Sequence, residues 1–514
     1  MYLLFPGRHH LLTQFQFDYL QKIIQEKSED KIVGIVFAVT SANHSGTKRN
    51  PIPFYLRAMM IQEFCEYLPA KSYVFGIDDV GELENFASYT LKQIQHQSEQ
   101  KLQLNAENTL LICSTPVMEM YKKLGFKVLT AELQDEKYQS YQTALPWELV
   151  ESISEHTDWA QANEIVSLIH QASKKIWQTY SLDEKVRNIL NDPIIGEDGD
   201  ITESRDYNSY VRQMDEIAEI KYKDTARYIK PGIIGDIGCA VGSWIKQASE
   251  DPRFRESDFY GIEVARQLYE ICLQRKNNRE FGNPYVFFAQ KNAVTSFVFQ
   301  KESMNTIHTS SLTHEIESYG NRQDLLKFIS NRYEELQSGG VWINRDVIGP
   351  ENGSKTILMQ LTTEDGRNDD FDLVFSDNTL LAEYLGGLST YALFKRFCMD
   401  FRKTENDQIS YNEIHIEGDT YFELALKDAA EFMLTKDYHD NWNSEMHERF
   451  CFWSFSEWKA TLESFGFRVE ESSSAYANPW IVQNRFENKV QLFDKNRKAL
   501  DYPPTNVLLL ASKI

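Results

Sequence analysis

The stretch Asp236-Ile237-Gly238-Cys239-Ala240-Val241-Gly242 decides the fold expected for the second half of the chain. It follows the apolar run 232–235 and precedes residues 243–248, whose composition predicts the start of a helix. A strand, a glycine loop and a helix form the basic unit of a nucleotide-type cleft, because glycines let the backbone approach a ligand and a helix N-terminus is electropositive. Such a string also occurs as an ordinary tight turn, so the interpretation needs support from elsewhere in the chain.

That support comes from an acid one strand and one helix later. Residues 259–263 predict a second strand, and it ends at Glu263. A carboxylate in this position can accept both hydroxyls of a ribose, and its charge disfavours a 2′-phosphate. The two segments together predict a cleft that binds a ribose-containing ligand.

The two segments resemble motif I and the following acidic position of class I S-adenosylmethionine-dependent methyltransferases. The similarity continues through 284–293, 304–311 and 336–346, where a Gly-Gly turn precedes what the resemblance makes the fifth strand. The resemblance implies a Rossmann-like α/β domain that binds S-adenosyl-L-methionine. The residues that it assigns to the cofactor are Asp236, Gly238, Ala240, Gly242, Glu263, Asn292, Ala293 and Ser310.

Three positions in this region need comment. Ala240 stands where the family has its middle glycine, and it adds only a methyl group. Asn292 stands where the family usually has an acid facing the adenine, so an amide hydrogen bond is expected there. His314 follows the fourth strand and is a candidate general base, since the pKa range of histidine suits that task. The alternative is a histidine that only makes a hydrogen bond at a helix start.

Composition limits the possible functions. At 514 residues, with 42% hydrophobic and 25% charged residues, the chain has room for about three globular domains. A net charge of −22 opposes tight non-specific binding to long nucleic acid. Six cysteines form no Cys-x-x-Cys pair, which favours reduced thiols over disulfides or a zinc site. The longest apolar run, 32–39, is too short to cross a bilayer, and the start of the chain shows no secretory leader. We therefore expect a cytoplasmic protein, of open oligomeric state.

The order of strand-like and helix-like segments predicts the domain organisation. Residues 1–150 alternate between the two types, which predicts a parallel sheet covered by helices. Residues 151–206 are predicted to be a helical linker that ends in a loop at 191–205. Residues 207–514 are predicted to form the methyltransferase domain, with a helical cap inserted at about 349–453. The expected fold class is α/β, with two Rossmann-like doubly wound domains.

Smaller elements are predicted within and after the cap. A strand is expected at 371–375 and helices at 379–402 and 421–435. Ser454 and Glu457 have the spacing of a capping box at the start of a further helix.

The first domain carries a second group of candidate residues. Polar residues 40–45 and 49–52 and then Arg57 follow the strand-like run 32–39. Such groups just past a strand end suit phosphate binding, although a polar loop with a solvated arginine is the alternative. With Gly7-Arg8 and the strings 76–80, 113–117 and 146–150, they resemble the nicotinamide-nucleotide adenylyltransferase family of the HIGH-type superfamily. The resemblance implies a nucleoside triphosphate with Mg²⁺ and a nucleotide site formed by Gly7, Arg8, Thr13, Gln16, Ser41, Asn50 and Arg57, with Arg57 also a catalytic candidate.

The first domain also departs from that family. Its His-x-x-His falls on Thr13 and Gln16, which carry no positive charge; His9 and His10 lie nearby and could substitute through a shifted turn. An expected arginine is missing near Gln142-Thr143. Losing these donors would remove several kcal/mol of stabilisation from a nucleotidyl transfer.

Two functions therefore compete. In one, the chain is a bifunctional methyltransferase whose nucleotidyltransferase-like domain acts on a nucleotide or a phosphorylated small molecule. In the other, the first domain is an inactive module that binds a nucleotide or an RNA end. A ligand sensor or scaffold is a third class.

Residues 438–448 are rich in groups that can bind metals. Their histidine spacing matches no compact zinc pattern, so no metal site is predicted. The segment is expected to be a loop of the cap that faces the substrate, or an amphipathic surface with Trp442 packed inward.

Overall fold

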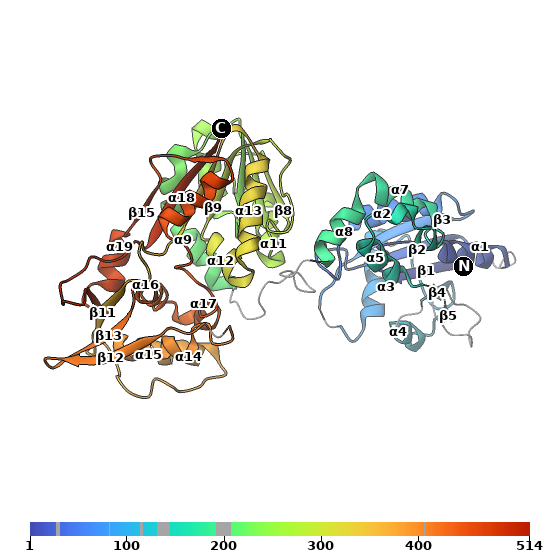
Figure 1. Ribbon diagram of the computed structural model, residues 1–514. Helices are drawn as coiled ribbons and strands as arrows, with labels where there is room; N and C mark the ends of the chain where they lie inside the picture. Colours follow the sequence, from blue (N-terminus) through green and yellow to red (C-terminus); the bar gives the residue numbers. More distant parts are fainter. Residues whose placement is uncertain (27–30, 82, 114–116, 131–143, 192–206, 406) are drawn as a thin grey trace. The chain divides into compact units, whose positions relative to one another are not determined.

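The computed structural model describes residues 1–26, 31–81, 83–113, 117–130, 144–191, 207–405 and 407–514. The chain divides into two compact units, Met1–Asp200 and Ile201–Ile514 (Figure 1). Of the features predicted above, the loop from residue 192 onward and residues 114–116 and 142–143 lie outside the described residues.

The first unit contains a five-stranded parallel sheet with the order β3-β2-β1-β4-β5. Its strands are β1 (Tyr2–Gly7), β2 (Gly34–Thr40), β3 (Lys71–Ile77), β4 (Thr109–Ile112) and β5 (Lys127–Leu129). Helices α1 (Gln14–Glu26), α2 (Phe54–Cys65), α3 (Phe86–Gln97) and α4 (Met118–Lys123) alternate with them. In the central strand β1, Leu3 and Phe5 belong to one core cluster and Leu4 to another, because both faces of the strand are covered. The predicted parallel sheet is confirmed.

The predicted helical linker is instead part of this unit. It contains α5 (Pro146–Glu155), α6 (Asn163–Val166), α7 (Gln171–Thr179) and α8 (Leu182–Leu190). Trp159, Trp177 and Val186 are buried in the same cluster as Leu3 and Phe5 of the sheet. The linker prediction is therefore wrong up to residue 191, because the apolar faces of these helices cover one face of the sheet.

The second unit is built on a larger sheet with the order β14-β17-β10-β9-β6-β7-β8. The strands are β6 (Ile233–Ile237), β7 (Asp258–Glu263), β8 (Val286–Gln290), β9 (Met304–Ser310), β10 (Leu336–Val347), β14 (Phe467–Val469) and β17 (Asn506–Lys513), with β15 (Ser474–Tyr476) paired to β17. Strands β6 to β10 are parallel, and β17 is antiparallel to β10. The chain order reverses between β6 and β9, which is where such sheets bind ligands.

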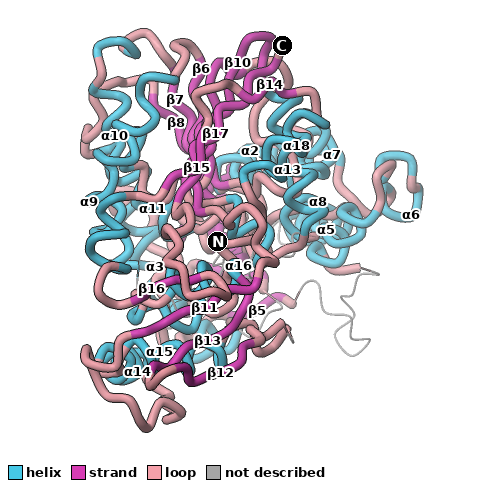
Figure 2. Tube along the Cα trace, turned by 60° about the vertical axis from the view of Figure 1, so that its left-hand side comes forward, coloured by secondary structure: helices cyan, strands magenta, loops and turns pink. Residues whose placement is uncertain are grey.

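Helices cover both faces of this sheet. Helices α10 (Ser243–Glu250) and α11 (Arg266–Asn277) share a core cluster with one face, and α9 (Tyr207–Thr225) packs on α10. Helices α13 (Arg322–Glu335) and α18 (Phe455–Ser464) share a cluster with the other face and lie side by side in Figures 1 and 2. The capping box predicted for Ser454 and Glu457 is confirmed at the start of α18.

The cap contains helices, as predicted, and also a sheet of its own, which the sequence did not predict. Its four antiparallel strands have the order β12-β13-β11-β16 and stand apart from the main sheet in Figure 2. They are β11 (Thr356–Leu361), β12 (Tyr411–Ile416), β13 (Asp419–Ala425) and β16 (Val490–Phe493). Helices α14 (Asn378–Gly386), α15 (Thr390–Asp400), α16 (Leu426–Thr435) and α17 (Trp442–Glu445) complete the cap. Strand β16 comes from beyond residue 453, so two chain segments build the cap.

Local sequence explains the differences within the cap. Residues 371–375 form a turn and an irregular segment rather than a strand, and the helix predicted at 379–402 breaks at Gly386-Gly387. The first part of 421–435 is strand β13, which forms a hairpin with β12. Its two-residue turn, Glu417-Gly418, has φ of 54° and 98°, and this conformation suits the twist of a hairpin.

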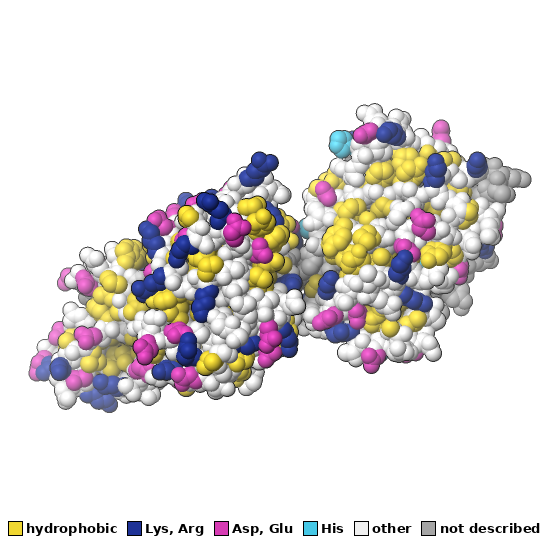
Figure 3. All heavy atoms as spheres, turned by 90° about the horizontal axis from the view of Figure 1, so that it is seen from above, with side chains coloured by type: hydrophobic (Ala, Val, Ile, Leu, Met, Phe, Trp, Pro, Cys, Tyr) yellow, Lys and Arg dark blue, Asp and Glu magenta, His cyan; other side chains and the backbone are white. Residues whose placement is uncertain are grey.

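The charged surface, the cysteines and the helices agree with what the composition predicted. On the face drawn in Figure 3, basic and acidic side chains are interspersed over each unit rather than gathered into a basic stripe. All six cysteines are free thiols. No helix among the described residues has both the length and the apolar composition that crossing a membrane requires.

Helix α7 provides a test of the domain boundary. Trp177 is fully buried, and its indole N–H donates to the carbonyl of His10 at 3.1 Å. We expect Trp177→Ala to lower the free energy of unfolding of the first unit by about 3–5 kcal/mol, because it leaves a cavity and an unpaired carbonyl. Chemical denaturation measures this, with Gln178→Ala on the exposed face of the same helix as the control. Equal effects of the two changes would restore the linker interpretation.

Candidate active site

The loop after β6 adopts a backbone conformation that glycine favours. Gly238, Ala240 and Gly242 have φ of 68°, 49° and 75°. A Cβ added to Gly238 would lie 3.1 Å from the side chain of Leu312, and one on Gly242 would lie 3.1 Å from Phe288. Ala240 bears the left-handed conformation at a cost of about 1–2 kcal/mol. The loop is therefore held close to its neighbours, and Gly242 becomes the N-cap of α10.

Glu263 at the end of β7 holds this loop in place. Its Oε2 accepts from the amide of Ala240 at 2.9 Å, and its Oε1 accepts from the amides of Val264 and Ala265, each at 2.8 Å. Burial raises the pKa of the Glu263 carboxyl to about 7, although the three amides act in the opposite direction. A carboxylate has about four acceptor positions, so one remains on Oε2 for a ligand.

A cavity of about 550 Å³ opens at the carboxyl ends of these strands, which is the volume range of small-molecule sites. Asp236, Gly238, Ala240, Glu263 and Ser310 line it on the sheet side. Residues that sequence reasoning did not single out also line it, among them Lys221, Trp244, His308, Glu315, Tyr319, Asp437 and Arg485.

Three predicted cofactor residues lie outside this lining. Gly242 caps α10, and Asn292 uses Oδ1 to accept from the amide of Val294 at 2.8 Å. Ala293 is buried in the core that contains Ile237 and Ile262. Their predicted contacts with the adenosine part of the cofactor remain predictions.

Asp236 makes a buried pair with a histidine of the adjacent strand. Its Oδ1 lies 2.7 Å from Nδ1 of His308, and both side chains are buried. The His308 ring stacks on Trp244 at 4.0 Å between centroids, nearly parallel. The Nε2 atom of His308 has no partner among the described residues. This pair fixes the first acid of the loop and gives the cavity an aromatic wall.

His314 lies between two carboxylates. Its Nδ1 lies 2.6 Å from Oδ1 of Asp346, and its Nε2 lies 3.3 Å from Oε2 of Glu448. Burial alone would lower the pKa of His314, but the charges of Asp346 and Glu448 outweigh it and raise the pKa well above its usual value. An imidazole that is already protonated cannot accept a proton, so the arrangement opposes the general-base role predicted for His314.

Lys221 of α9 is better suited to accept a proton. It lines the cavity, and burial, together with the charge of Arg345, lowers its pKa to about 8. A general base works best when its pKa lies near the working pH. Lys221 lies on a long polar helix before the glycine loop, and no motif in the sequence marked it as a residue of the site.

The cap contributes the segment that the sequence marked as rich in metal-competent groups. Residues 437–441, Glu445 and Glu448 line the cavity. Trp442 is 1% exposed and packs inward, which was one of the two predicted alternatives. The segment therefore faces the cavity on one side and the core of the cap on the other.

In the first unit, Thr13 and Gln16 bond to each other. The amide of Thr13 donates to Oε1 of Gln16 at 3.0 Å, and the amide of Gln16 donates to Oγ1 of Thr13 at 3.1 Å. These are the reciprocal bonds of a capping box, here at the start of α1. The side chains that stand at the family's His-x-x-His positions thus hold the helix end.

The position of Arg57 conflicts with its predicted phosphate-binding and catalytic roles. It is fully buried, and its guanidinium donates to the carbonyls of Arg8, Thr40 and Ser41 at 2.8–3.0 Å. Burial, aided by the charge of Arg8, lowers its pKa to about 10. Arg57 therefore ties the loop after β1 to the end of β2.

The other residues predicted to bind a nucleotide lie near the ends of β1 and β2. Burial lowers the pKa of His9 to about 4 and that of His10 well below its usual value, so neither supplies positive charge at neutral pH. Ser41 donates to Asp79 at 3.4 Å, and Arg8 donates to the carbonyl of Arg49 at 2.8 Å. Gly7 ends β1. Asn50 is buried, and its backbone N–H donates to Oγ1 of Thr47.

Solved methyltransferase structures resemble this chain at low sequence identity. No family model matches the chain, and no curated protein matches it. An S-adenosylmethionine-dependent methyltransferase structure from Mesorhizobium loti is 11% identical, with 58% of this chain and 100% of that chain covered and a TM-score of 0.33. A putative one from Listeria monocytogenes is 14% identical, with 59% and 99% covered and a TM-score of 0.29. Geranyl diphosphate C-methyltransferase from Streptomyces coelicolor A3(2), solved with Mg²⁺, geranyl diphosphate and S-adenosyl-L-homocysteine, is 9% identical, with 63% and 90% covered and a TM-score of 0.30.

Replacing Arg57 tests its role. Arg57→Met keeps an apolar stem but removes three hydrogen bonds from a charged donor to backbone carbonyls, so we expect a loss of about 3 kcal/mol or more in the free energy of unfolding. Lys22→Met on the exposed face of α1 is the control. Unchanged stability combined with lost binding of a nucleoside triphosphate in calorimetry would instead assign Arg57 to phosphate.

Proposed function

We propose that the second unit is an S-adenosyl-L-methionine-dependent methyltransferase that acts on a small molecule in the cavity beside β6 and β7. The observation that carries the proposal is the left-handed loop 238–242 joined to Glu263 through the Ala240 amide. Both lie at the carboxyl ends of parallel strands and beside the switch point of the sheet, and both line the cavity.

The residues fit this cofactor. Glu263 has one acceptor position left, which suits a ribose hydroxyl. The lining contains the acidic side chains of Asp236, Glu315, Asp437, Asp440, Glu445 and Glu448 as well as that of Glu263. Among the described residues, the cationic side chains of the lining are Lys221, Arg485 and His314, whose pKa is raised by its two carboxylate partners. Such a cavity attracts a cationic cofactor.

S-Adenosyl-L-methionine supplies, when bound, a methyl group on a positively charged sulfur. The task of the protein is then mainly to align the acceptor with that group and to exclude water. Trp244 and residues of the cap line the cavity, and we assign Asp236, which is paired with His308, to the amino group of the cofactor. Lys221 is the residue that we assign to take the proton of the acceptor.

The first unit fits an inactive binding module better than a nucleotidyltransferase. Thr13 and Gln16 bond to each other, Arg57 bonds to carbonyls, and His9 is neutral. A retained binding role is favoured by His10, which is 4% exposed and whose two ring nitrogens have no partner among the described residues. In the second unit, the acidic lining opposes a nucleotide or an RNA end as the methyl acceptor unless a cation accompanies it.

Removing the charge of Glu263 tests the cofactor site. We expect Glu263→Gln to weaken binding of S-adenosyl-L-methionine and S-adenosyl-L-homocysteine by about tenfold or more, because a hydrogen bond to a charged acceptor is lost. Isothermal titration calorimetry measures this. Glu270→Gln on the exposed face of α11 makes the same chemical change outside the cavity and should leave the affinity unchanged. No binding by the wild-type protein would refute the proposed function.

The raised pKa of Glu263 predicts opposite effects of pH on binding and on stability. Cofactor affinity should rise from pH 6 to pH 8, because only the ionised carboxylate has its full acceptor strength and its pKa is about 7. The stability that this carboxyl contributes is fully present below its usual pKa of 4.5 and is lost as the pH rises through about 7. Calorimetry and denaturation across this range measure both slopes, and Glu263→Gln should flatten both. Identical slopes in the variant would remove Glu263 as their cause.

A further inference from the structure

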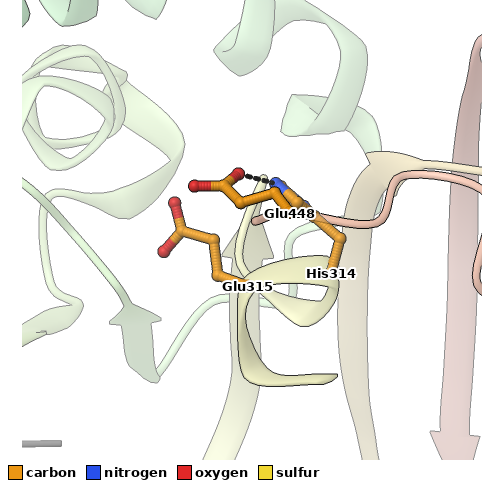
Figure 4. A group of neighbouring side chains, drawn as sticks. All are labelled: His314, Glu315 and Glu448. Atoms are coloured by element: carbon orange, nitrogen blue, oxygen red, sulfur yellow. Dashed lines mark ion pairs between the residues drawn. The ribbon is translucent and has the colours of Figure 1, made fainter. Parts of the chain in front are cut away.

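Three side chains that can bind a metal meet in the cavity from distant parts of the chain. His314 and Glu315 begin α12 (Thr313–Tyr319), and Glu448 follows α17 in the cap. One ligand atom from each lies within 4.8 Å of the others. Figure 4 shows the two carboxylates pointing toward each other and the ion pair of His314 with Glu448. Ligand atoms around one six-coordinate ion of 2.0–2.2 Å bond length span about this distance.

The surroundings of His314 resemble those of a metal-binding histidine. Nδ1 lies 2.6 Å from the fully buried carboxylate of Asp346, which fixes the ring and its tautomer. Nε2 is thereby turned toward Glu448, and a cation bound there would replace the proton on Nε2, because a histidine ligand has to be neutral. An outer carboxylate on the second ring nitrogen is the usual support of a histidine ligand.

The charges of the cluster also favour a cation. One imidazole faces the carboxylates of Asp346, Glu448 and Glu315, and the first two are almost completely buried. A bound cation would add to the stabilisation that His314 gives these carboxylates. In the same cavity, Nε2 of the buried His308 has no partner among the described residues, which points independently to a polar ligand there.

We propose that His314, Glu315 and Glu448 bind one divalent cation of the Mn²⁺ class, a class that accepts a mixture of imidazole and carboxylate ligands. Three protein ligands leave coordination positions open, and such positions hold and polarise an oxygen of a substrate. The role in catalysis rests on the proposed function. There the cation holds a hydroxyl of the methyl acceptor, Lys221 takes the hydroxyl proton, and the oxygen receives the methyl group as the carbon–sulfur bond breaks with its electron pair left on sulfur.

Metal binding is tested directly on the full-length protein. Titration with Mn²⁺, followed by the electron paramagnetic resonance signal of the free ion, should show one site per chain. Glu315→Gln and Glu448→Gln should each weaken it by about tenfold or more, as expected for lost ligands. These two are preferred to a change at His314, because loss of the imidazole also leaves Asp346 buried without its partner. Circular dichroism confirms that the variants are folded.

Two control variants distinguish the loss of a metal ligand from the loss of a nearby negative charge. Glu445→Gln removes a carboxylate from the same cavity outside the cluster, and Glu317→Gln removes one from α12 outside the cavity lining. Neither should change Mn²⁺ affinity more than twofold. Absence of a stoichiometric site, or an equal loss in Glu445→Gln, would overturn the proposal.

The cofactor provides the link to the proposed function. The Glu448→Gln variant should still bind S-adenosyl-L-homocysteine, because Glu263 and the loop are unchanged. If the protein binds Mn²⁺ but not S-adenosyl-L-homocysteine, the proposed methyltransferase is refuted and the metal site stands. If it binds S-adenosyl-L-homocysteine but not Mn²⁺, the metal site is refuted and the proposed methyltransferase stands.

Discussion

The position of the buried His314 imidazole between Asp346 and Glu448 is the constraint on which the second unit depends. Asp346 lies near the end of β10 in the main sheet and Glu448 belongs to the cap, so the His314 side chain joins the two parts of the second unit. Removing one partner of a buried charge pair typically costs about 3–5 kcal/mol, which is a large part of the stability of a domain. Tyr319 reinforces the contact by donating to Glu448 at 3.0 Å. The side of the cavity formed by the cap is thus fixed by charge as well as by apolar packing.

The sequence predicted the parts of the fold that depend on local pattern. The parallel sheets, the strand–loop–helix at 233–250 and the capping box at Ser454 follow from periodicity, from glycine and from the spacing of two polar residues. It failed where long-range packing decides. The helices at 146–190 have the same amphipathic pattern whether they cover a sheet or join two domains. Strand β16 reaches the cap sheet from a segment about 130 residues after β11, and no local pattern encodes that pairing.

The same limit applies to the site. Asp236 and Glu263 could be predicted because a glycine loop and a strand end place them. The cluster of His314, Glu315 and Glu448 could not, because 132 residues separate its last two members and the cap brings them together. The first unit shows the reverse case. Thr13 and Gln16 were recognised from the spacing of a nucleotide-binding motif, but the same spacing serves a capping box, and only the hydrogen bonds distinguish the two.

The charge of the cavity links the two proposals. Carboxylates that attract a sulfonium stabilise the charged cofactor before the reaction, and the attraction is lost once the sulfur becomes a neutral thioether. Stabilisation of the reactant alone raises the barrier to transfer, because catalysis requires the transition state to be held more tightly than the ground state. A divalent cation on Glu315 and Glu448 would neutralise part of that negative charge. It would also place positive charge beside the acceptor oxygen. The acidic lining would then favour entry of the cofactor at Glu263 without opposing methyl transfer to that oxygen.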